Sequence, residues 1–329
     1  MERLRIGLIG ASRIAPQAVI APAAGRDDAE VVAVAARDPA RAQAFADRFA
    51  IPAVEPDYLS LLRRPDIDLI YVASPPALHA EHAIAALGHG KAVLCEKPFA
   101  MTVQEAEAMV AAGERAGRPL IEAFHYRFHP VIARLLDYVR SGRIGTIEAI
   151  EARFHTPIPL RPSELRWSAE LGGGALMDLG CYGVHVARTL AAAEPEVIEA
   201  HRVMSGGVDV STVARLRFPG GAEAVVDCSM GPDGRDRSLW VRGSAGVIEL
   251  SNFVNPHAGA TLSVRGAGVD EVIEVSDPTT YDAQLAHVVQ VMQGLARPLT
   301  GGADAIANLR AMAAIVAGSS RQPAEIRGA

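Results

Sequence analysis

The first 124 residues alternate short, predominantly apolar segments with segments of helical pattern. The apolar runs cover residues 4–9, 31–36, 69–73, 92–95 and 120–123, and helix-like sequence separates most of them. Fully apolar strands joined by helices are typical of a parallel sheet that is covered on both faces. We therefore predict an α/β domain over residues 1–124, built on a doubly wound parallel sheet.

Two helix starts in this half carry clear capping signals. Asp38 is followed by Pro39, which makes a favourable N-cap with proline at the first helical position. Thr102 and Glu105 have the spacing of a capping box, for a helix that runs to Ala116. Asp38 is thus explained as a helix cap rather than as a ligand contact.

The alternation ends after residue 124, and strand-like segments then dominate. After a helix at 130–140, such segments occur at 146–154, 197–204, 211–218, 222–228, 239–241 and 247–250. Pro-Gly-Gly at 219–221 predicts a hairpin turn between two of them. Because helices no longer intervene, we predict a second, α+β domain over residues 125–329 with an antiparallel or mixed sheet.

Composition excludes several classes of protein. Of 329 residues, 50% are hydrophobic and 21% charged, which argues against a disordered or fibrous chain. A net charge of −6 without a basic cluster argues against nucleic-acid binding. Three cysteines are too few for a disulfide framework, and no histidine spacing predicts a metal site. No apolar run reaches the roughly 18–20 residues of a membrane span. Met1 leads almost directly into the first strand, so we expect a soluble cytoplasmic protein.

The turn after the first apolar run is a candidate dinucleotide site. Residues 10–15 read Gly-Ala-Ser-Arg-Ile-Ala, where the fingerprint is Gly-x-Gly-x-x-Gly. Gly10 supplies the tight turn and Ala15 allows close packing of helix on strand, while Ser12 replaces the middle glycine and can donate its hydroxyl to a phosphate oxygen. The helix start that follows attracts an anion. An ordinary strand-to-helix turn is the alternative, but the alternation that follows favours the nucleotide site.

The end of the second apolar run bears on the choice of cofactor. An acidic residue there would bind the ribose hydroxyls of NAD, whereas this chain has Ala36 and Arg37, with Arg41 one turn later. Two guanidinium groups suit the 2′-phosphate of NADP, so NADP is predicted, with NAD as a second choice. The alternative is that both arginines belong to a solvated helix start.

Glu96, Lys97 and Pro98 follow the apolar run at 92–95. Proline disfavours helical geometry in the residue before it, so Lys97 is held where the strand ends. The carboxyl ends of parallel strands form the ligand crevice, where partial desolvation lowers the pKa of an ammonium group that donates and accepts protons. A surface lysine without a function is the alternative, and the stiff neighbour argues against it.

In the second half, three glycines at 172–174 precede a helical pattern over 175–190. On an α-helix, Asp178, Tyr182 and His185 lie within roughly 60° of one another between two apolar flanks. This narrow polar stripe predicts the lining of an internal cleft, and the glycines allow a ligand or cofactor to approach closely. A stripe satisfied by structural hydrogen bonds is the alternative, and His185 fits it nearly as well.

Two further segments are candidates for substrate contact. Arg166 and Trp167, just upstream of the glycines, offer an aromatic wall for a sugar or an aromatic diol, or a tryptophan that only packs. His125 and Tyr126, at the domain junction, present the same two alternatives. We retain Trp167, His125 and His185 as predicted substrate-binding residues.

Five motifs occur in an order that resembles the glucose–fructose oxidoreductase/inositol dehydrogenase (Gfo/Idh/MocA) family. They are GLIGASRIA at 7–15, SPPALH at 74–79, CEKP at 95–98, EAFHYRFHP at 122–130 and LGGGALMDLGCY at 171–182. Each is weak alone, but together they are highly specific and span nearly the whole chain. The last two are most similar to the branch of dihydrodiol and xylose-type sugar dehydrogenases, with Tyr182 where inositol dehydrogenases typically carry histidine.

The resemblance implies an N-terminal Rossmann domain with a bound nicotinamide cofactor. It implies a C-terminal domain whose large open, mostly antiparallel sheet often forms the subunit interface, here of a homodimer or homotetramer. The family's catalytic lysine corresponds to Lys97, and its acid/base pair to Asp178 and Tyr182. Combined with the loop analysis, the resemblance predicts these cofactor-binding residues: Gly10, Ser12, Arg13, Ile14, Arg37, Arg41, Ser74, Pro75, His79, Glu96 and Lys97.

These residues predict an NADP-dependent oxidoreductase that acts on a hydroxyl or carbonyl of a sugar, polyol or dihydrodiol. Tyr182 exchanges the proton, Lys97 lowers the pKa of its phenol, and Asp178 orients the substrate hydroxyl or tunes the pair. One alternative is a cofactor-bound regulator that senses a sugar without turnover, against which the acid/base residues argue. Another is a glycosidase that oxidises and re-reduces its sugar with permanently bound NAD, against which the two arginines argue.

Overall fold

The computed structural model describes residues 3–161, 164–232, 234–266, 268–276 and 278–323, and the chain forms two compact units. The first unit comprises residues 1–128 and 281–306, and the second comprises residues 129–280 and 307–329. The sequence predicts a single boundary after residue 124. The structure differs from that expectation because it groups the segment 281–306 with the N-terminal residues.

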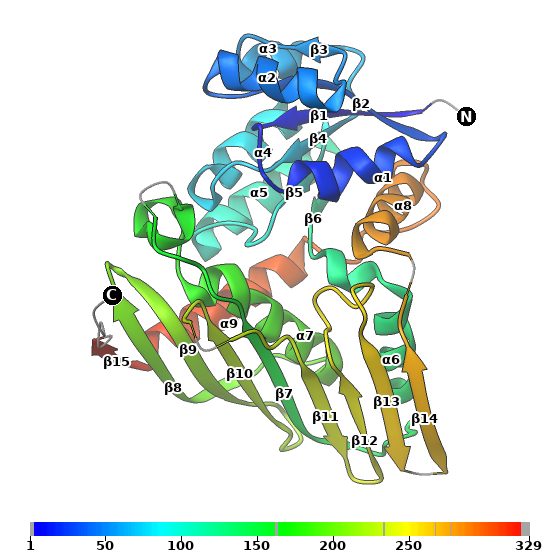
Figure 1. Ribbon diagram of the computed structural model, residues 1–329, viewed down its shortest axis with the longest axis vertical. Coiled ribbons are helices and arrows are strands. Elements are labelled where there is room, and N and C mark those ends of the chain that lie inside the picture. Colours follow the sequence, from blue (N-terminus) through cyan, green and yellow to red (C-terminus); the bar gives the residue numbers. More distant parts are fainter. Residues whose placement is uncertain (1–2, 162–163, 233, 267, 277, 324–329) are drawn as a thin grey trace. The chain divides into compact units, whose positions relative to one another are not determined.

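The first unit is built on a six-stranded parallel sheet with the order β3-β2-β1-β4-β5-β6 (Figure 1). Its strands are β1 (Leu4–Ile9), β2 (Ala29–Ala35), β3 (Ala53–Val54), β4 (Leu69–Val72), β5 (Ala92–Cys95) and β6 (Leu120–Glu122). Its helices are α1 (Ala21–Ala24), α2 (Pro39–Phe49), α3 (Tyr58–Arg63), α4 (His79–Gly88), α5 (Val103–Ala116) and α8 (Thr280–Met292). The predicted parallel sheet is confirmed, and its strand order reverses between β1 and β4, the point at which such sheets bind dinucleotides.

Both predicted capping signals are confirmed. The Asp38 carboxylate accepts hydrogen bonds from the backbone N–H groups of Ala40 and Arg41, at 2.9 and 3.3 Å, and α2 begins at Pro39. Thr102 and Glu105 form a reciprocal capping box at the start of α5. These local contacts satisfy N–H groups that a helix leaves without partners in its first turn.

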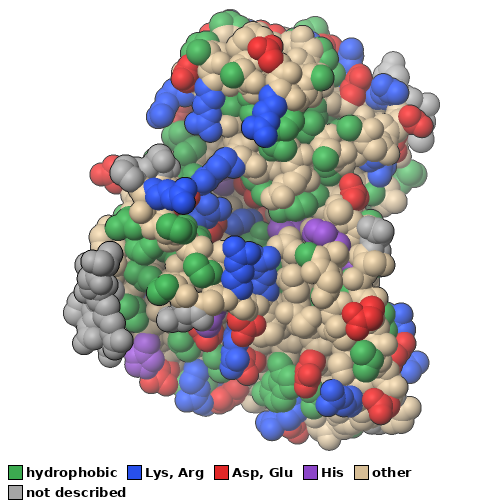
Figure 2. Space-filling model, viewed as in Figure 1, with side chains coloured by type: hydrophobic (Ala, Val, Ile, Leu, Met, Phe, Trp, Pro, Cys, Tyr) green, Lys and Arg blue, Asp and Glu red, His purple; other side chains and the backbone are tan. Residues whose placement is uncertain are grey.

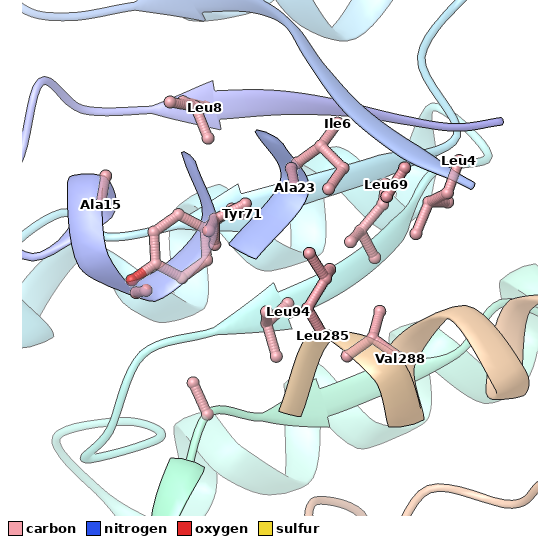
Figure 3. Packing of buried hydrophobic residues seen from close by; sticks show 14 of the residues in the cluster. Leu4, Ile6, Leu8, Ala15, Ala23, Leu69, Tyr71, Leu94, Leu285 and Val288 are labelled. Atoms are coloured by element: carbon pink, nitrogen blue, oxygen red, sulfur yellow. The ribbon is translucent and has the colours of Figure 1, made fainter. Parts of the chain in front are cut away.

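The core of the first unit explains why the segment 281–306 belongs to it. Figure 3 shows Leu285 and Val288 of α8 pointing toward Leu69 of β4 and Leu94 of β5, and all four are at most 1% exposed. Burying one such side chain stabilises a fold by about 1.5–3 kcal/mol. Helix α8 therefore completes the core of the first unit, although it follows eight of the nine strands of the second sheet in the sequence.

The second unit is built on a nine-stranded sheet with the order β14-β13-β12-β11-β7-β10-β9-β8-β15 (Figure 1). Its strands are β7 (Ile147–His155), β8 (Glu196–Ser205), β9 (Val208–Arg217), β10 (Glu223–Ser229), β11 (Leu239–Gly243), β12 (Gly246–Leu250), β13 (Thr261–Gly266), β14 (Val269–Glu274) and β15 (Ser319–Pro323). The helices α6 (Pro130–Arg140), α7 (Cys181–Ala191) and α9 (Ala303–Ala317) accompany it. Among the described strands of this second sheet, only the pairs β7–β10 and β8–β15 are parallel, so the predicted mostly antiparallel sheet is confirmed.

One face of this sheet carries the helix that holds the predicted acid/base residues. Gly180 and Gly183 lie so close to β10 that a Cβ would be 2.8 Å from Cys228 Sγ at the first and from Val226 Cγ1 at the second. Alternate residues of β10 are buried under the helix, and the others are half-buried on the opposite face. Acidic and basic side chains are interspersed over the surface of this unit (Figure 2), with ion pairs such as Arg217–Glu223 at 3.0 Å.

The hairpin predicted at residues 219–221 is confirmed. It joins β9 to β10, and the Phe218 N–H donates to the Ala222 carbonyl at 2.8 Å. Across the described ranges, no helix is both long enough and apolar enough to cross a membrane.

Candidate active site

The turn after β1 lies at the switch point of the first sheet. Gly10 has φ +97°, a backbone conformation that side chains disfavour, and a Cβ there would be 3.4 Å from the Ala73 carbonyl that follows β4. The Gly10 N–H donates to the Ala35 carbonyl at the end of β2, at 2.8 Å. The turn therefore touches the ends of β2 and β4, as a nucleotide loop at a switch point requires.

The Ser12 side chain makes a hydrogen bond within the turn. Its Oγ accepts a hydrogen bond from the Ala15 N–H at 3.2 Å, which leaves the hydroxyl proton able to donate elsewhere. Within the part of the chain that the structure describes, the N–H groups of Ser12 and Ile14 have no acceptor in the protein. These donors next to a glycine turn fit an anionic pyrophosphate.

The two arginines after β2 are both exposed, and one of them is tied to the nucleotide turn. The Arg41 guanidinium donates from Nη2 to the Ala11 carbonyl at 2.9 Å. Arg37 lies two residues after the end of β2, and Asp38 is engaged as the helix cap. The arrangement presents basic groups where an NAD-specific site has an acidic one.

The loop after β4 is held by a buried histidine. The two ring nitrogens of His79 lie 2.9 Å from the carbonyl oxygens of Ser74 and Pro98, and the side chain is 1% exposed. Burial lowers the pKa of His79 to about 4, so the imidazole is neutral at physiological pH. His79 was predicted to bind the cofactor, whereas both of its nitrogens contact loops of its own chain. A neutral imidazole has one N–H and donates to one of these two carbonyls, so the side chain lies between the loops that carry Ser74 and Pro98, and its contact with the cofactor stays a prediction.

Glu96 is also engaged within the first unit. Its buried carboxylate accepts hydrogen bonds from the Tyr71 hydroxyl at 2.6 Å and from the Lys97 N–H at 3.3 Å. Burial, followed by the Glu96 charge, raises the pKa of Tyr71 well above its usual range. Lys97 itself is the second residue after β5 and is half-buried. The Glu96 side chain thus anchors the residue before Lys97 to β4.

His125 lies at the end of the Rossmann portion of the chain. It is 4% exposed, and its ring centroid is 4.3 Å from that of Tyr281 in α8. Tyr126 is fully buried and contacts Phe124 edge-on. These contacts show that both rings pack within the first unit, and substrate contact by His125 stays a prediction.

The helix predicted over residues 175–190 begins differently from the expectation. Its first turn, Leu176–Gly180, is π-helical, and α7 follows from Cys181. The Cys181 N–H donates to the Leu176 carbonyl five residues earlier. A π turn widens the helix locally and occurs often at functional sites, and here it contains Asp178.

The glycines before this helix approach their own chain rather than an open space for a ligand. A Cβ on Gly173 would lie 2.5 Å from the Arg166 carbonyl oxygen, and one on Gly174 would collide with the Asp209 carboxylate. The Gly174 N–H donates to the same Arg166 carbonyl at 2.9 Å. The prediction that these glycines admit a ligand or cofactor is therefore wrong for Gly173 and Gly174, because their space is filled by backbone and by Asp209.

Asp178 forms an ion pair that the sequence did not predict. Arg166 Nε lies 2.6 Å from Asp178 Oδ2, and Arg166 Nη1 lies 3.0 Å from Glu164 Oε1. The Asp178 charge is the main cause of the raised pKa of Arg166. No sequence periodicity relates Arg166 to a residue twelve positions later, so only the three-dimensional path of the loop brings them together.

Tyr182 and His185 are buried, with exposures of 3% and 1%. The Tyr182 ring contacts Phe154 of β7 edge-on, with centroids 5.5 Å apart. Trp167 is half-buried and donates its indole N–H to the Ile158 carbonyl at 3.0 Å, which holds the loop before the glycines. Its predicted contact with substrate is untested by this geometry, as is that of His185.

A buried carboxylate on β9 fixes the start of the π turn and was also missed by sequence analysis. Asp209 accepts hydrogen bonds from the Leu176 N–H at 2.8 Å and the Thr212 hydroxyl at 2.6 Å, and it pairs with Arg202 at 3.2 Å. Among the described residues, no group of three or more His, Cys, Asp or Glu side chains is arranged to hold a metal ion.

Two family models match the two parts of the chain. Residues 4–124 match a model described as an oxidoreductase family with an NAD-binding Rossmann fold, and residues 132–249 match the GFO/IDH/MocA C-terminal domain. The chain belongs to the Gfo/Idh/MocA family. The predicted resemblance is thereby confirmed, and this Gfo/Idh/MocA protein is an oxidoreductase with a nucleotide-binding Rossmann domain.

Relatives with assigned activities align with this chain over most of its length. The D-xylose 1-dehydrogenase (NADP(+)) 2 of Haloferax volcanii is 32% identical, and the alignment covers 95% of this chain and 96% of the relative. The trans-1,2-dihydrobenzene-1,2-diol dehydrogenase of Xenopus laevis is 32% identical over 82% of this chain and 83% of its own. The crystal structure of KijD10, a 3-ketoreductase from Actinomadura kijaniata in complex with NADP and TDP-benzene, matches with a TM-score of 0.90 and 27% identity over 98% of this chain and 100% of its own.

Proposed function

We propose that this protein is an NADP-dependent dehydrogenase or reductase that acts on a hydroxyl or carbonyl group of a sugar, polyol or dihydrodiol. The named activities of the aligned relatives support this substrate class. One observation supports NADP most directly, which is the hydrogen bond from Arg41 to the Ala11 carbonyl. It holds a guanidinium beside the nucleotide turn, and the strand β2 is followed by Ala36 and Arg37 where an NAD-specific site has an acidic residue.

Removing the Arg41 side chain tests the choice of cofactor. A charge-assisted hydrogen bond contributes about 1.5–3 kcal/mol, so Arg41→Ala is expected to weaken NADPH binding by about 10- to 150-fold. Binding of NADH, which lacks the 2′-phosphate, is expected to change little. Fluorescence titration with both cofactors measures the two dissociation constants.

The matched control is Arg48→Ala, which removes an exposed arginine from the last turn of the same helix. It is expected to leave both dissociation constants unchanged. Equal losses for NADPH and NADH in Arg41→Ala, or a wild-type protein that prefers NADH, contradict the assignment of NADP.

The residues of both units have distinct roles in the proposed reaction. Gly10, Ser12 and Ile14 offer the turn and N–H groups that hold a pyrophosphate, and the nicotinamide supplies the position that accepts or donates hydride. Tyr182 gives a proton to the substrate oxygen or takes one from it. Lys97 stabilises the negative charge that this exchange leaves on the phenol.

Variants of Tyr182 and Lys97 test the proton transfer. Tyr182→Phe is expected to lower kcat by about 10²- to 10⁴-fold, with little change in cofactor affinity. Lys97→Met is expected to lower kcat as well. Because both groups serve one proton transfer, the double variant is expected to lose much less than the product of the single losses. Full kcat in Tyr182→Phe, or multiplicative losses in the double variant, would remove this pair from the mechanism.

A panel of free sugars, polyols and dihydrodiols at saturating NADP tests the substrate class. Turnover of at least one member with hydride transfer is expected, and its absence across the whole panel would favour a regulator that only binds the cofactor. Tightly bound NAD in the purified protein would favour the glycosidase instead, because that reaction returns its hydride to the same sugar.

A further inference from the structure

We propose that Arg166 is a positioning residue that neutralises the Asp178 carboxylate and thereby lets the Tyr182 phenol carry negative charge during proton transfer. The proposal rests on the acid/base role proposed for Tyr182. It assigns a role to the ion pairs of Arg166 with Glu164 and Asp178. The sequence motifs of the chain do not explain these ion pairs.

The guanidinium of Arg166 is held between two carboxylates. It lies 2.6 Å from Asp178 and 3.0 Å from Glu164, and the Asp178 and Glu164 side chains are only 14% and 9% exposed. An ion pair this short and this shielded from water is stronger than an exposed pair, in which water and salt screen both charges. The ion pair therefore holds the Asp178 side chain in a fixed orientation.

The backbone of Arg166 is as firmly placed as its side chain. Its carbonyl accepts the Gly174 N–H at 2.9 Å, and Gly173 packs against the same carbonyl without room for a Cβ. Because Gly173 and Gly174 have no side chain, the segment that carries Arg166 packs directly against the start of the helix that carries Asp178. This close packing places the Arg166 guanidinium next to Asp178 in the π turn.

Asp178 and Tyr182 are neighbours on that helix. They are four residues apart, across the junction between the π turn and α7, and such residues lie on adjoining turns. A carboxylate without a cation at that spacing would oppose ionisation of the phenol. The Arg166 guanidinium reduces this effect because it lies 2.6 Å from the Asp178 carboxylate, while its second contact is with Glu164.

The elements that pack on the helix carry other charged or titratable groups of the second unit. β10 brings the Cys228 thiol against Gly180, and β9 brings Asp209, which is already paired with Arg202. Arg237 lies over the Phe154 ring, 5.5 Å from its centroid, and Tyr182 contacts the same ring edge-on. His185 follows one turn later on the helix itself. Among these groups, Arg166 is the cation whose contact with Asp178 the structure specifies.

Titration of the Tyr182 phenol tests the proposal directly. Tyrosine labelled with carbon-13 at Cζ reports each of the six phenols by NMR, and Tyr182→Phe identifies the signal of Tyr182. In Arg166→Gln the Tyr182 signal is expected to titrate about one pH unit higher than in the wild type, which is a tenfold change in the ionisation constant. Arg166→Lys, which retains the charge, is expected to recover most of that shift.

The matched control is Arg64→Gln in the first unit. Arg64 also bridges two carboxylates, with 2.9 Å to Glu55 and 2.7 Å to Asp66, so the control removes a similar ion pair far along the chain from the helix. It is expected to leave the titration of Tyr182 unchanged. An Arg166→Gln protein whose Tyr182 titrates as in the wild type overturns the proposal, as does a phenol that ionises in neither protein before unfolding.

Kinetics separate this proposal from the proposed function. If the enzyme turns over its substrate, Arg166→Gln is expected to lower kcat at neutral pH by about tenfold, to shift the pH profile of kcat upward and to leave the dissociation constant of NADPH unchanged. The NMR titration needs no turnover. A shifted phenol in a protein without dehydrogenase activity would therefore sustain the electrostatic role of Arg166 and refute only the proposed function.

Discussion

The buried carboxylate of Asp209 provides a quantitative test of how the site helix is held. Asp209 is 2% exposed and satisfies the Leu176 N–H and the Thr212 hydroxyl while it pairs with Arg202, which is 9% exposed. Asp209→Ala removes all three interactions and leaves the Arg202 guanidinium buried without this carboxylate. Breaking a buried ion pair from one side costs about 3–5 kcal/mol, a large part of the roughly 5–15 kcal/mol that stabilises a typical domain.

A second substitution divides that loss into its parts. In Asp209→Ala with Arg202→Leu, the stranded cation is removed as well, so the remaining loss comes from two hydrogen bonds at about 1 kcal/mol each. We therefore expect the double variant to lose about 2 kcal/mol, less than Asp209→Ala alone. Urea unfolding followed by circular dichroism measures the free energies of unfolding.

The control for this cycle is an exposed carboxylate on the same sheet. Glu223 pairs with Arg217 at 3.0 Å and with Arg215 at 3.1 Å, and all three side chains are well exposed. Glu223→Ala is expected to change the free energy of unfolding by less than about 1 kcal/mol. A double variant that instead loses as much free energy of unfolding as Asp209→Ala and Arg202→Leu lose together as single variants would contradict this reasoning. That result would show that the buried ion pair is not the source of the cost.

Two further predictions concern the loops around the site. Burial lowers the pKa of His79 to about 4 from an ordinary value of 6.5, so its contribution to stability is fully present above pH 6.5 and is lost as the pH falls toward 4. The loss is about 3 kcal/mol, and unfolding of His79→Gln at a series of pH values is expected to show a flatter dependence over that interval. Gly173→Ala places a Cβ 2.5 Å from the Arg166 carbonyl oxygen and is expected to cost about 1–3 kcal/mol or more, seen as a lower Tm and lower kcat. Gly88→Ala, where no atom lies within 4 Å of the added Cβ, is expected to leave both unchanged, and equal effects of the two substitutions would contradict the packing argument.

Features that depend on neighbouring residues were available from the sequence. The apolar run of β5 was predicted at its observed bounds, the cap at Asp38 was predicted with Pro39 at the first helical position, and the capping box of Thr102 was predicted with its partner Glu105. Lys97 was expected at the end of a buried strand, and the structure places it two residues after the last residue of β5. Periodicity, capping and turn signals involve only a few neighbouring residues. They can therefore be recognised in the sequence without knowledge of the fold.

Contacts between distant segments were decided by tertiary structure alone. The apolar face of α8 does not reveal that it packs under β4 and β5, which precede it by some two hundred residues. The pairing of Arg166 with Asp178, and of Asp209 with the Leu176 N–H, depends on how loops return to one helix start. For the same reason the sequence pointed to a ligand beside Gly173, where the folded chain has placed its own backbone. The local sequence shows which side chains are apolar enough to be buried. Which segment fills a given buried space depends on the packing of the whole chain.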